Sequence, residues 1–123
     1  MITGTVTPEG VPHIHLEVAG QAWPGIIDTG FNGDVELPAQ LQDAINAQYL
    51  GRITSVLGGG QRVEEDLYLV DFPFDGQVYV LEATFALSAE ILIGTHLLRQ
   101  YRLTIDFPRR TVQLELSHDV SAV

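Results

Sequence analysis

The sequence predicts an almost all-β domain of short strands and tight turns, with one or two short helices. Apolar and polar residues alternate in several short segments, as they do in strands that bury one face. Glycine, proline and Asp-Gly turns separate these segments, and helical spacing occurs in only a few places. Short strands joined by hairpins are typical of a closed or half-closed barrel, which is the architecture that we expect.

The chain of 123 residues is long enough for one domain, 1–123, but too short for two lobes. Its net charge of −10 disfavours binding to nucleic acid or to an anionic membrane. No apolar run approaches the roughly 20 residues of a membrane span, and the start shows no signal-peptide pattern. The absence of cysteine excludes disulfides and thiolate catalysis. We therefore expect a cytoplasmic protein that binds neither nucleic acid nor membranes.

The first two expected strands, residues 2–6 and 13–18, form a hairpin. His13 and His15 lie on one face of the second strand, so they could supply two imidazoles to a metal ion. No third ligand is evident, so we prefer the interpretation that the two histidines form an exposed polar face opposite Ile14. We therefore predict no metal site and no cofactor.

The third expected strand, residues 22–27, ends on a carboxylate. Asp28 follows its apolar end, where a charge needs a partner or a purpose. Gly30 then allows the backbone to turn sharply and to approach another group closely. Pro24 inside the strand indicates a sheet edge or a bulge. For Trp23 we expect a place in the core rather than in a substrate pocket.

The middle of the chain contains a predicted hairpin with an unusual tip. After a short strand at 35–37 and a helical segment at 39–45, the strands at 52–57 and 62–63 flank three successive glycines. Three glycines exceed what a tight turn requires, which favours a tip that opens and closes over an ordinary turn. We interpret the acidic residues 64–66 as a solvated run that discourages edge pairing.

Five more strands complete the predicted sheet. The first two, 67–72 and 77–85, join across the hairpin signal Asp75-Gly76. An apolar run at 91–93 ends at Gly94, as in a buried strand that another backbone approaches closely. After helical turns at 97–100, the strands 101–106 and 111–116 follow, and we expect no ordered element after Leu116.

Asp28-Thr29-Gly30 resembles the catalytic signature of the aspartic proteases. With residues 31–38 it is most similar to the small retropepsin-like proteases of prokaryotes. Two further elements occur in the expected order: residues 57–61 resemble the glycine-rich flap tip, and residues 91–98 resemble the apolar-apolar-Gly segment and short helix of that family. The resemblance extends from about residue 26 to residue 116.

This resemblance implies a retropepsin-like closed barrel that acts as an aspartic endopeptidase on a peptide or protein substrate. Acid proteolysis needs two carboxylates that share one proton, and Asp28 is the only acid followed by Thr-Gly or Ser-Gly. A two-fold homodimer would bring two copies of it together. The family's chain ends intertwine at that interface, which here concerns residues 2–6 and 111–116.

Residue roles also follow from the resemblance. One Asp28 takes a proton from water and the other donates to the peptide carbonyl, Thr29 bonds across the dimer axis, and Gly30 offers its amide. Ile93 and Gly94 support the site. The expected substrate contacts are Phe31, Asn32, Leu57, Gly58, Gly59, Gly60 and Gln61.

Other interpretations remain beside the protease. Asp28, Asn32 and Gly33 match positions one, five and six of a calcium loop, but Gly30 and Ala39 stand where ligands are required, so we exclude it. A catalytically silent peptide-binding module on the same barrel and a purely structural dimer stay open. The chain departs from the retroviral members in two ways. Thr95 replaces an arginine that braces the dimer, and the flap lacks a branched apolar tip.

Overall fold

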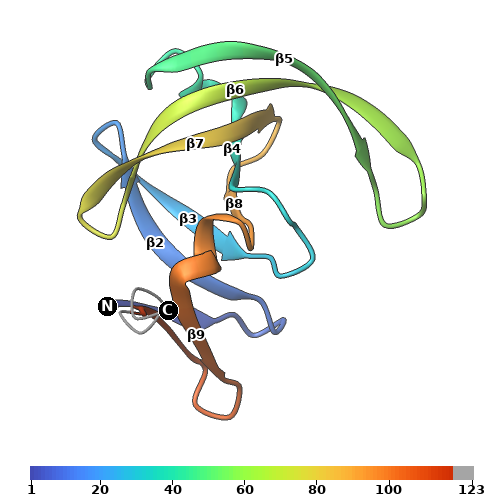
Figure 1. The fold of residues 1–123 in the computed structure, drawn as a ribbon. Helices are drawn as coiled ribbons and strands as arrows, with labels where there is room; N and C mark the ends of the chain where they lie inside the picture. The colour runs from blue at the N-terminus through green and yellow to red at the C-terminus, as the bar shows by residue number, and fades with distance from the viewer. Residues whose placement is uncertain (118–123) are drawn as a thin grey trace.

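The computed structural model describes residues 1–117 and arranges them as one mixed sheet of ten strands with two short 3-10 helices (Figure 1). The all-β prediction is confirmed, and none of these residues forms an α-helix. The end of the predicted domain 1–123, and the expectation that no element follows Leu116, concern residues outside this range. In the described part, no helix is long and apolar enough to cross a membrane. The elements are β1 (Ile2–Val6), β2 (Pro12–Val18), β3 (Gln21–Ile27), β4 (Val35–Pro38), η1 (Ala39–Leu41), β5 (Ala47–Val56), β6 (Arg62–Phe74), β7 (Gln77–Ala86), β8 (Ile91–Ile93), η2 (Leu97–Gln100), β9 (Tyr101–Asp106) and β10 (Thr111–Leu116).

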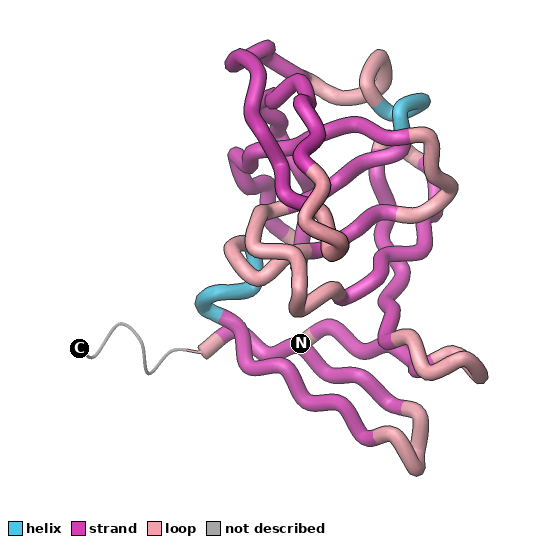
Figure 2. The backbone as a smooth tube through the Cα atoms, turned by 90° about the vertical axis from the view of Figure 1, so that its right-hand side faces the viewer, coloured by secondary structure: helices cyan, strands magenta, loops and turns pink. Residues whose placement is uncertain are grey.

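The sheet is open, so the prediction of a closed barrel is wrong. Its strand order is β5-β6-β7-β4-β8-β3-β2-β1-β10-β9, which leaves β5 and β9 at opposite ends. Closure would require these two end strands to pair. Instead β6 is longer than β7, and the two strands pair only from Tyr68 of β6 onward. The part of β6 before Tyr68 belongs to the β5–β6 hairpin, which arches away from the rest of the sheet (Figure 1). Figure 2 shows the N-terminus and the strands beside it in the lower half of the molecule, away from the arching hairpin.

The core lies on the concave side of the bent sheet and follows the predicted alternation. In β2, for example, Ile14 and Val18 are fully buried while His15 and Glu17 are exposed. Trp23 is only 7% exposed and packs in this core, as expected. The largest fully buried side chains are Phe72, Phe74, Ile14, Leu37, Leu41, Ile91, Ile93 and Leu114.

Strand β8 brings together two segments that are far apart in the sequence. It lies parallel to β3, with Ile27 opposite Ile93, and antiparallel to β4, with Val35 opposite the same Ile93. The ends of β3 and β8 therefore meet just before Asp28. Pro24 pairs in regular register with β2. On its other side, β3 pairs with β8 only from the residue after Pro24 onward, so the missing backbone N–H of Pro24 interrupts no hydrogen bond with β8.

Two predictions about the middle of the chain are wrong. The helical segment expected at 39–45 is a single 3-10 turn, η1, followed by turns. The strands expected separately at 62–63 and 67–72 are one continuous strand, β6, in which the acidic run 64–66 pairs with β5. The other edge of this run has no partner strand, because the ladder with β7 begins only at Tyr68. Strand alternation accommodates the run, because only Glu65 turns inward while its two neighbours face solvent. The Asp75-Gly76 hairpin is confirmed, since both residues have positive φ, as its turn type requires.

The strands expected between subunits pair within one chain. β1 lies between β2 and β10, and β10 lies between β1 and β9. The ladder between β1 and β2 begins only at Gly4, so the first two residues of β1 have a partner strand on one side alone. The expectation that residues 2–6 and 111–116 form a sheet between two subunits stays a prediction. The free edge at this end of the sheet belongs to β9.

Candidate active site

Asp28 is held by the turn that follows β3. Its backbone amide donates to the carbonyl oxygen of Ile93 at 3.0 Å, and its own carbonyl accepts from the amide of Phe31 at 3.1 Å. The Gly30 amide donates to Oδ1 of the Asp28 carboxylate at 2.9 Å. A charge-assisted bond of this kind fixes the direction of the carboxylate. The half-buried carboxylate is thus placed by local backbone geometry, with its second oxygen left for another partner.

The segment after β8 supports the turn from behind. The amides of Gly94, Thr95 and His96 donate to carbonyl oxygens of Asp34, Phe31 and Gly33 at 2.9, 2.8 and 3.1 Å. A Cβ on Gly94 would collide with the carbonyl oxygen of Gly33, so only glycine permits this approach. Ile93 and Gly94 thus lie against the Asp28 turn, and their expected role in supporting a catalytic site stays a prediction.

A groove of about 420 Å³ opens beside Asp28, within the range usual for ligand sites. The loop after β3 forms one end, the strands β4, β7 and β8 form one wall, and the arching β5–β6 hairpin forms the other (Figure 1). The lining residues are Asp28, Gly30, Phe31, Gly33, Asp34, Val35, Glu36, Ile53, Ser55, Val56, Leu57, Gly58, Glu65, Leu67, Glu82, Ala83, Thr84 and Leu92.

The predicted substrate contacts divide into two groups. Phe31, Leu57 and Gly58 line the groove. The lining does not include Asn32, Gly59, Gly60 or Gln61. Thr29 is exposed, and no residue in the range 1–117 accepts a hydrogen bond from its hydroxyl.

The hairpin tip is closed by two backbone bonds. The Leu57 amide donates to the Gln61 carbonyl at 2.8 Å, and the Gly60 amide donates to the Leu57 carbonyl at 2.9 Å. Only Gly60 has a positive φ, of 82°, so the turn itself requires one of the three glycines. Val56 and Leu57 are 66% and 46% exposed beside the tip. Branched apolar side chains are therefore present next to the glycines, although none stands at the tip itself.

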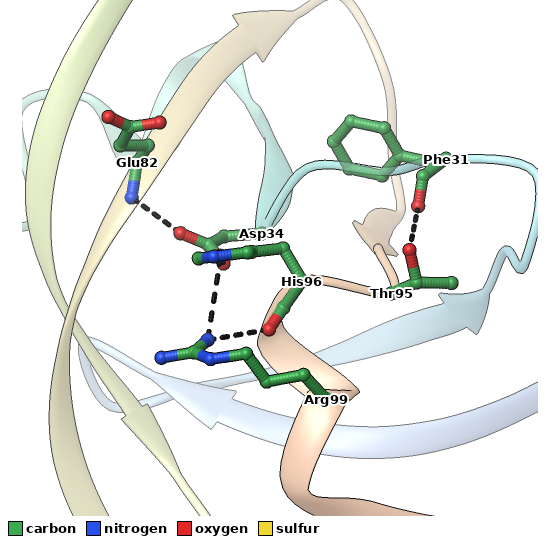
Figure 3. Close-up of polar contacts among 6 residues, drawn as sticks. All are labelled: Phe31, Asp34, Glu82, Thr95, His96 and Arg99. Carbon is green, nitrogen blue, oxygen red and sulfur yellow. Dashed lines mark hydrogen bonds and ion pairs between the residues drawn. The ribbon is translucent and has the colours of Figure 1, made fainter.

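Asp34 and His96 form a hydrogen-bonded pair that sequence reasoning missed. The Asp34 carboxylate is 6% exposed; its Oδ2 accepts from the Glu82 amide at 3.0 Å, and its Oδ1 lies 2.6 Å from His96 Nδ1 (Figure 3). Arg99 Nη1 donates to the His96 carbonyl at 2.6 Å, and the Thr95 hydroxyl donates to the Phe31 carbonyl at 3.3 Å (Figure 3). A hydrogen-bonded side-chain pair thus exists one residue beyond Thr95, within the chain. The one signal in the sequence was an acid directly before a buried strand.

Glu36 is a second acid that the sequence did not single out. It lies in the middle of β4, opposite Leu92 of β8 and Thr84 of β7, and points into the groove. Partial burial raises the pKa of the Glu36 carboxyl, and the negative charges of Glu65 and Asp28 raise this pKa further. Alternation within the predicted strand placed Glu36 opposite the core, but it could not show that this face forms a groove.

The two histidines of β2 lie side by side, with ring centroids 5.8 Å apart, and His13 Nδ1 is 3.3 Å from the Thr5 hydroxyl. Within residues 1–117, no three His, Asp or Glu side chains are grouped so that they could share a metal ion. His13 is half-buried and His15 is exposed on this strand.

Comparison with known proteins identifies the fold. No family model matches the sequence, and no curated protein matches it either. Among solved structures, a retropepsin-like aspartic protease from Rickettsia conorii superposes with a TM-score of 0.65 and 17% identity, over 92% of this chain and 88% of its own. The fold is retropepsin-like.

A second structure with this fold is the foamy viral protease-reverse transcriptase in complex with an RNA/DNA hybrid. It superposes with a TM-score of 0.59 and 17% identity, over 76% of this chain and 13% of its own. At this identity the likeness concerns the retropepsin-like fold, and the activity of this chain has to be inferred from the geometry of its site.

Proposed function

We propose that the protein is an aspartic endopeptidase whose catalytic pair consists of Asp28 from each of two chains. The observation that carries this proposal is the placement of Asp28. Its carboxylate is fixed by the Gly30 amide and lies at the end of a groove that the β5–β6 hairpin covers. A groove with apolar walls and one oriented carboxylate suits an extended peptide whose scissile bond lies beside that carboxylate.

The chemistry requires a second carboxylate. One chain supplies a single Asp-Thr-Gly turn, and two-fold pairing would place two such turns face to face. Two carboxylates at contact distance share one proton, so one acts as the base toward water and the other as the acid toward the carbonyl oxygen. The exposed Thr29 hydroxyl is free to bond across that axis. A monomer would keep the groove but would lack the second carboxylate, so it would bind peptides without cleaving them.

The test is Asp28→Asn, which keeps the volume of the side chain but cannot accept the proton. We expect cleavage of peptides from a library to fall to background, with thermal unfolding and groove binding retained. Asp43→Asn, on the exposed side of the turn after η1, is the matched control and should cleave normally. Cleavage that survives Asp28→Asn would remove Asp28 from the mechanism.

Inhibitors provide an independent arm of the same test. A statine-type peptide should block cleavage, because its hydroxyl takes the place of the water between the carboxylates. Chelators and thiol reagents should have no effect. Loss of activity in EDTA would point to a metal mechanism and against the carboxylate pair.

A further inference from the structure

Acidic side chains line the groove from several sides, and no basic side chain lines it. Glu36 comes from β4, Glu65 from β6 and Glu82 from β7, while Asp28 lies at one end. None of the lining residues in the described chain is Lys, Arg or His. The groove therefore combines apolar walls with a concentrated negative charge, which would raise the local concentration of cationic ligands.

Strand register explains why two of these acids face each other. Glu36 shares its face of the sheet with Leu92 and Thr84, its cross-strand neighbours. Glu65 lies opposite Ile53 in the arching hairpin, and both line the groove from the other wall. The two glutamates therefore approach the same space from opposite walls.

No basic side chain among residues 1–117 forms an ion pair with either glutamate. Glu36 forms no hydrogen bond or ion pair with any residue of the described chain, and Glu65 receives only a long bond of 3.4 Å from the Ser55 hydroxyl. Asp34 differs because His96 pairs with it, and Glu64 differs because Arg52 lies 3.4 Å from it. A half-buried carboxylate without a partner is costly, and an arriving cation would relieve that cost. The raised pKa of Glu36, due first to burial and then to Glu65 and Asp28, agrees with this strain.

Resting on the proposed peptide-cleaving function, we propose that the groove selects peptides with a lysine or arginine side chain, whose cationic end lies between Glu36 and Glu65. The aliphatic stem of such a side chain would lie against Ile53, Leu67 and Leu92, which line the same space. A metal ion fits this place less well, because the described residues hold no group of three ligands close enough to share one. A lysine or arginine needs only the two opposing carboxylates.

The experiment compares two peptides that differ only in one residue, lysine or norleucine, since norleucine keeps the stem and lacks the ammonium group. Binding to the Asp28→Asn protein is measured by fluorescence anisotropy, and cleavage by the unmodified protein is followed by mass spectrometry. We expect the lysine peptide to bind roughly tenfold more tightly, as is common when an opposing charge is buried. Glu36→Gln and Glu65→Gln should each remove much of that preference.

Glu17→Gln is the matched control, because it removes the same charge from an exposed position on β2 outside the groove. It should leave the lysine preference unchanged. Equal binding of both peptides, or an equal loss of preference in Glu17→Gln, would overturn the proposal and assign the attraction to the net charge of the chain. Cleavage without charge preference would leave the endopeptidase standing and overturn only this inference. A lysine preference that depends on Glu36, without cleavage, would support this inference and contradict the endopeptidase.

Discussion

Three carboxylates that are close in the sequence lie in three different surroundings. Asp28 is oriented by a backbone amide, Asp34 is buried against a histidine, and Glu36 stands in the groove without a partner. The motif alone pointed to Asp28. Asp34 was unpredictable because its partner His96 lies 62 residues away and depends on how β8 meets β4. For Glu36, strand alternation predicted that the side chain points away from the core. It did not predict that the β5–β6 hairpin lies over that face of the sheet.

Asp34→Ala should destabilise the protein by about 2–3 kcal/mol, because the Glu82 amide would lose its acceptor in a buried place. Asp34→Asn should cost less, since its amide oxygen can still accept from Glu82. Urea unfolding of both variants measures the difference. If both variants are as stable as the original protein, the buried pair does not brace the site.

Glu36→Gln should stabilise the protein at neutral pH. The folded protein raises the pKa of Glu36, so the folded state binds this proton more readily than the unfolded chain does. The destabilising effect of the charge is therefore fully present above the raised pKa and absent below the ordinary glutamate pKa of about 4.3. We expect a gain of about 0.5 kcal/mol or less at pH 7, because much of the side chain remains in water.

Urea unfolding at about pH 7 and at about pH 3.5, on either side of the ordinary glutamate pKa, measures this gain. Glu17→Gln corrects for the general benefit of removing one charge from an acidic chain. A gain that persists in acid, after that correction, would show that the charge of Glu36 is not the cause.

At the scale of elements, most strands followed from period-two alternation and the turns followed from Asp-Gly and glycine signals. The hairpin at Asp75-Gly76 is one example. The predictions that were wrong concern segments whose structure depends more on the strands beside them than on their own amino-acid composition. The acidic run 64–66 became part of β6 because β5 pairs with it, and residues 39–45 formed only one helical turn before the chain entered β5. Local sequence does not contain either constraint.

Gly94→Ala should damage the protein, whereas Gly58→Ala should not. The new Cβ at Gly94 would meet the Gly33 carbonyl in the packed support of the Asp28 turn, which should cost at least about 2 kcal/mol. Gly58 has open space around it and no positive φ, so alanine there should be neutral or slightly stabilising. Thermal unfolding of the two variants measures the contrast. Equal stability would mean that the turn and the segment after β8 are not tightly packed.

At the scale of the whole molecule, the sequence predicted the fold family but not the open sheet. The order of the Asp-Thr-Gly turn, the glycine hairpin and the apolar-Gly segment indicated a retropepsin-like fold, which the structural comparison bears out. Closure depends on whether β5 meets β9, two strands that are distant along the chain, and nothing in either strand specifies that contact. The same holds for β1 and β10, whose pairing within the chain is not specified by the local pattern of either strand.

A mixing experiment tests the central claim, that two copies of Asp28 form one active site. Asp28→Asn protein is added to a fixed amount of unmodified protein with saturating peptide substrate. The unmodified protein is kept at a concentration where its specific activity no longer rises. Mixed dimers would hold one carboxylate and be inactive, so an equal amount of the variant should reduce activity to about half. Asp43→Asn protein, added in the same way, should add its own activity. Activity that stays unchanged as Asp28→Asn protein is added would show that each chain works alone and would contradict the shared site.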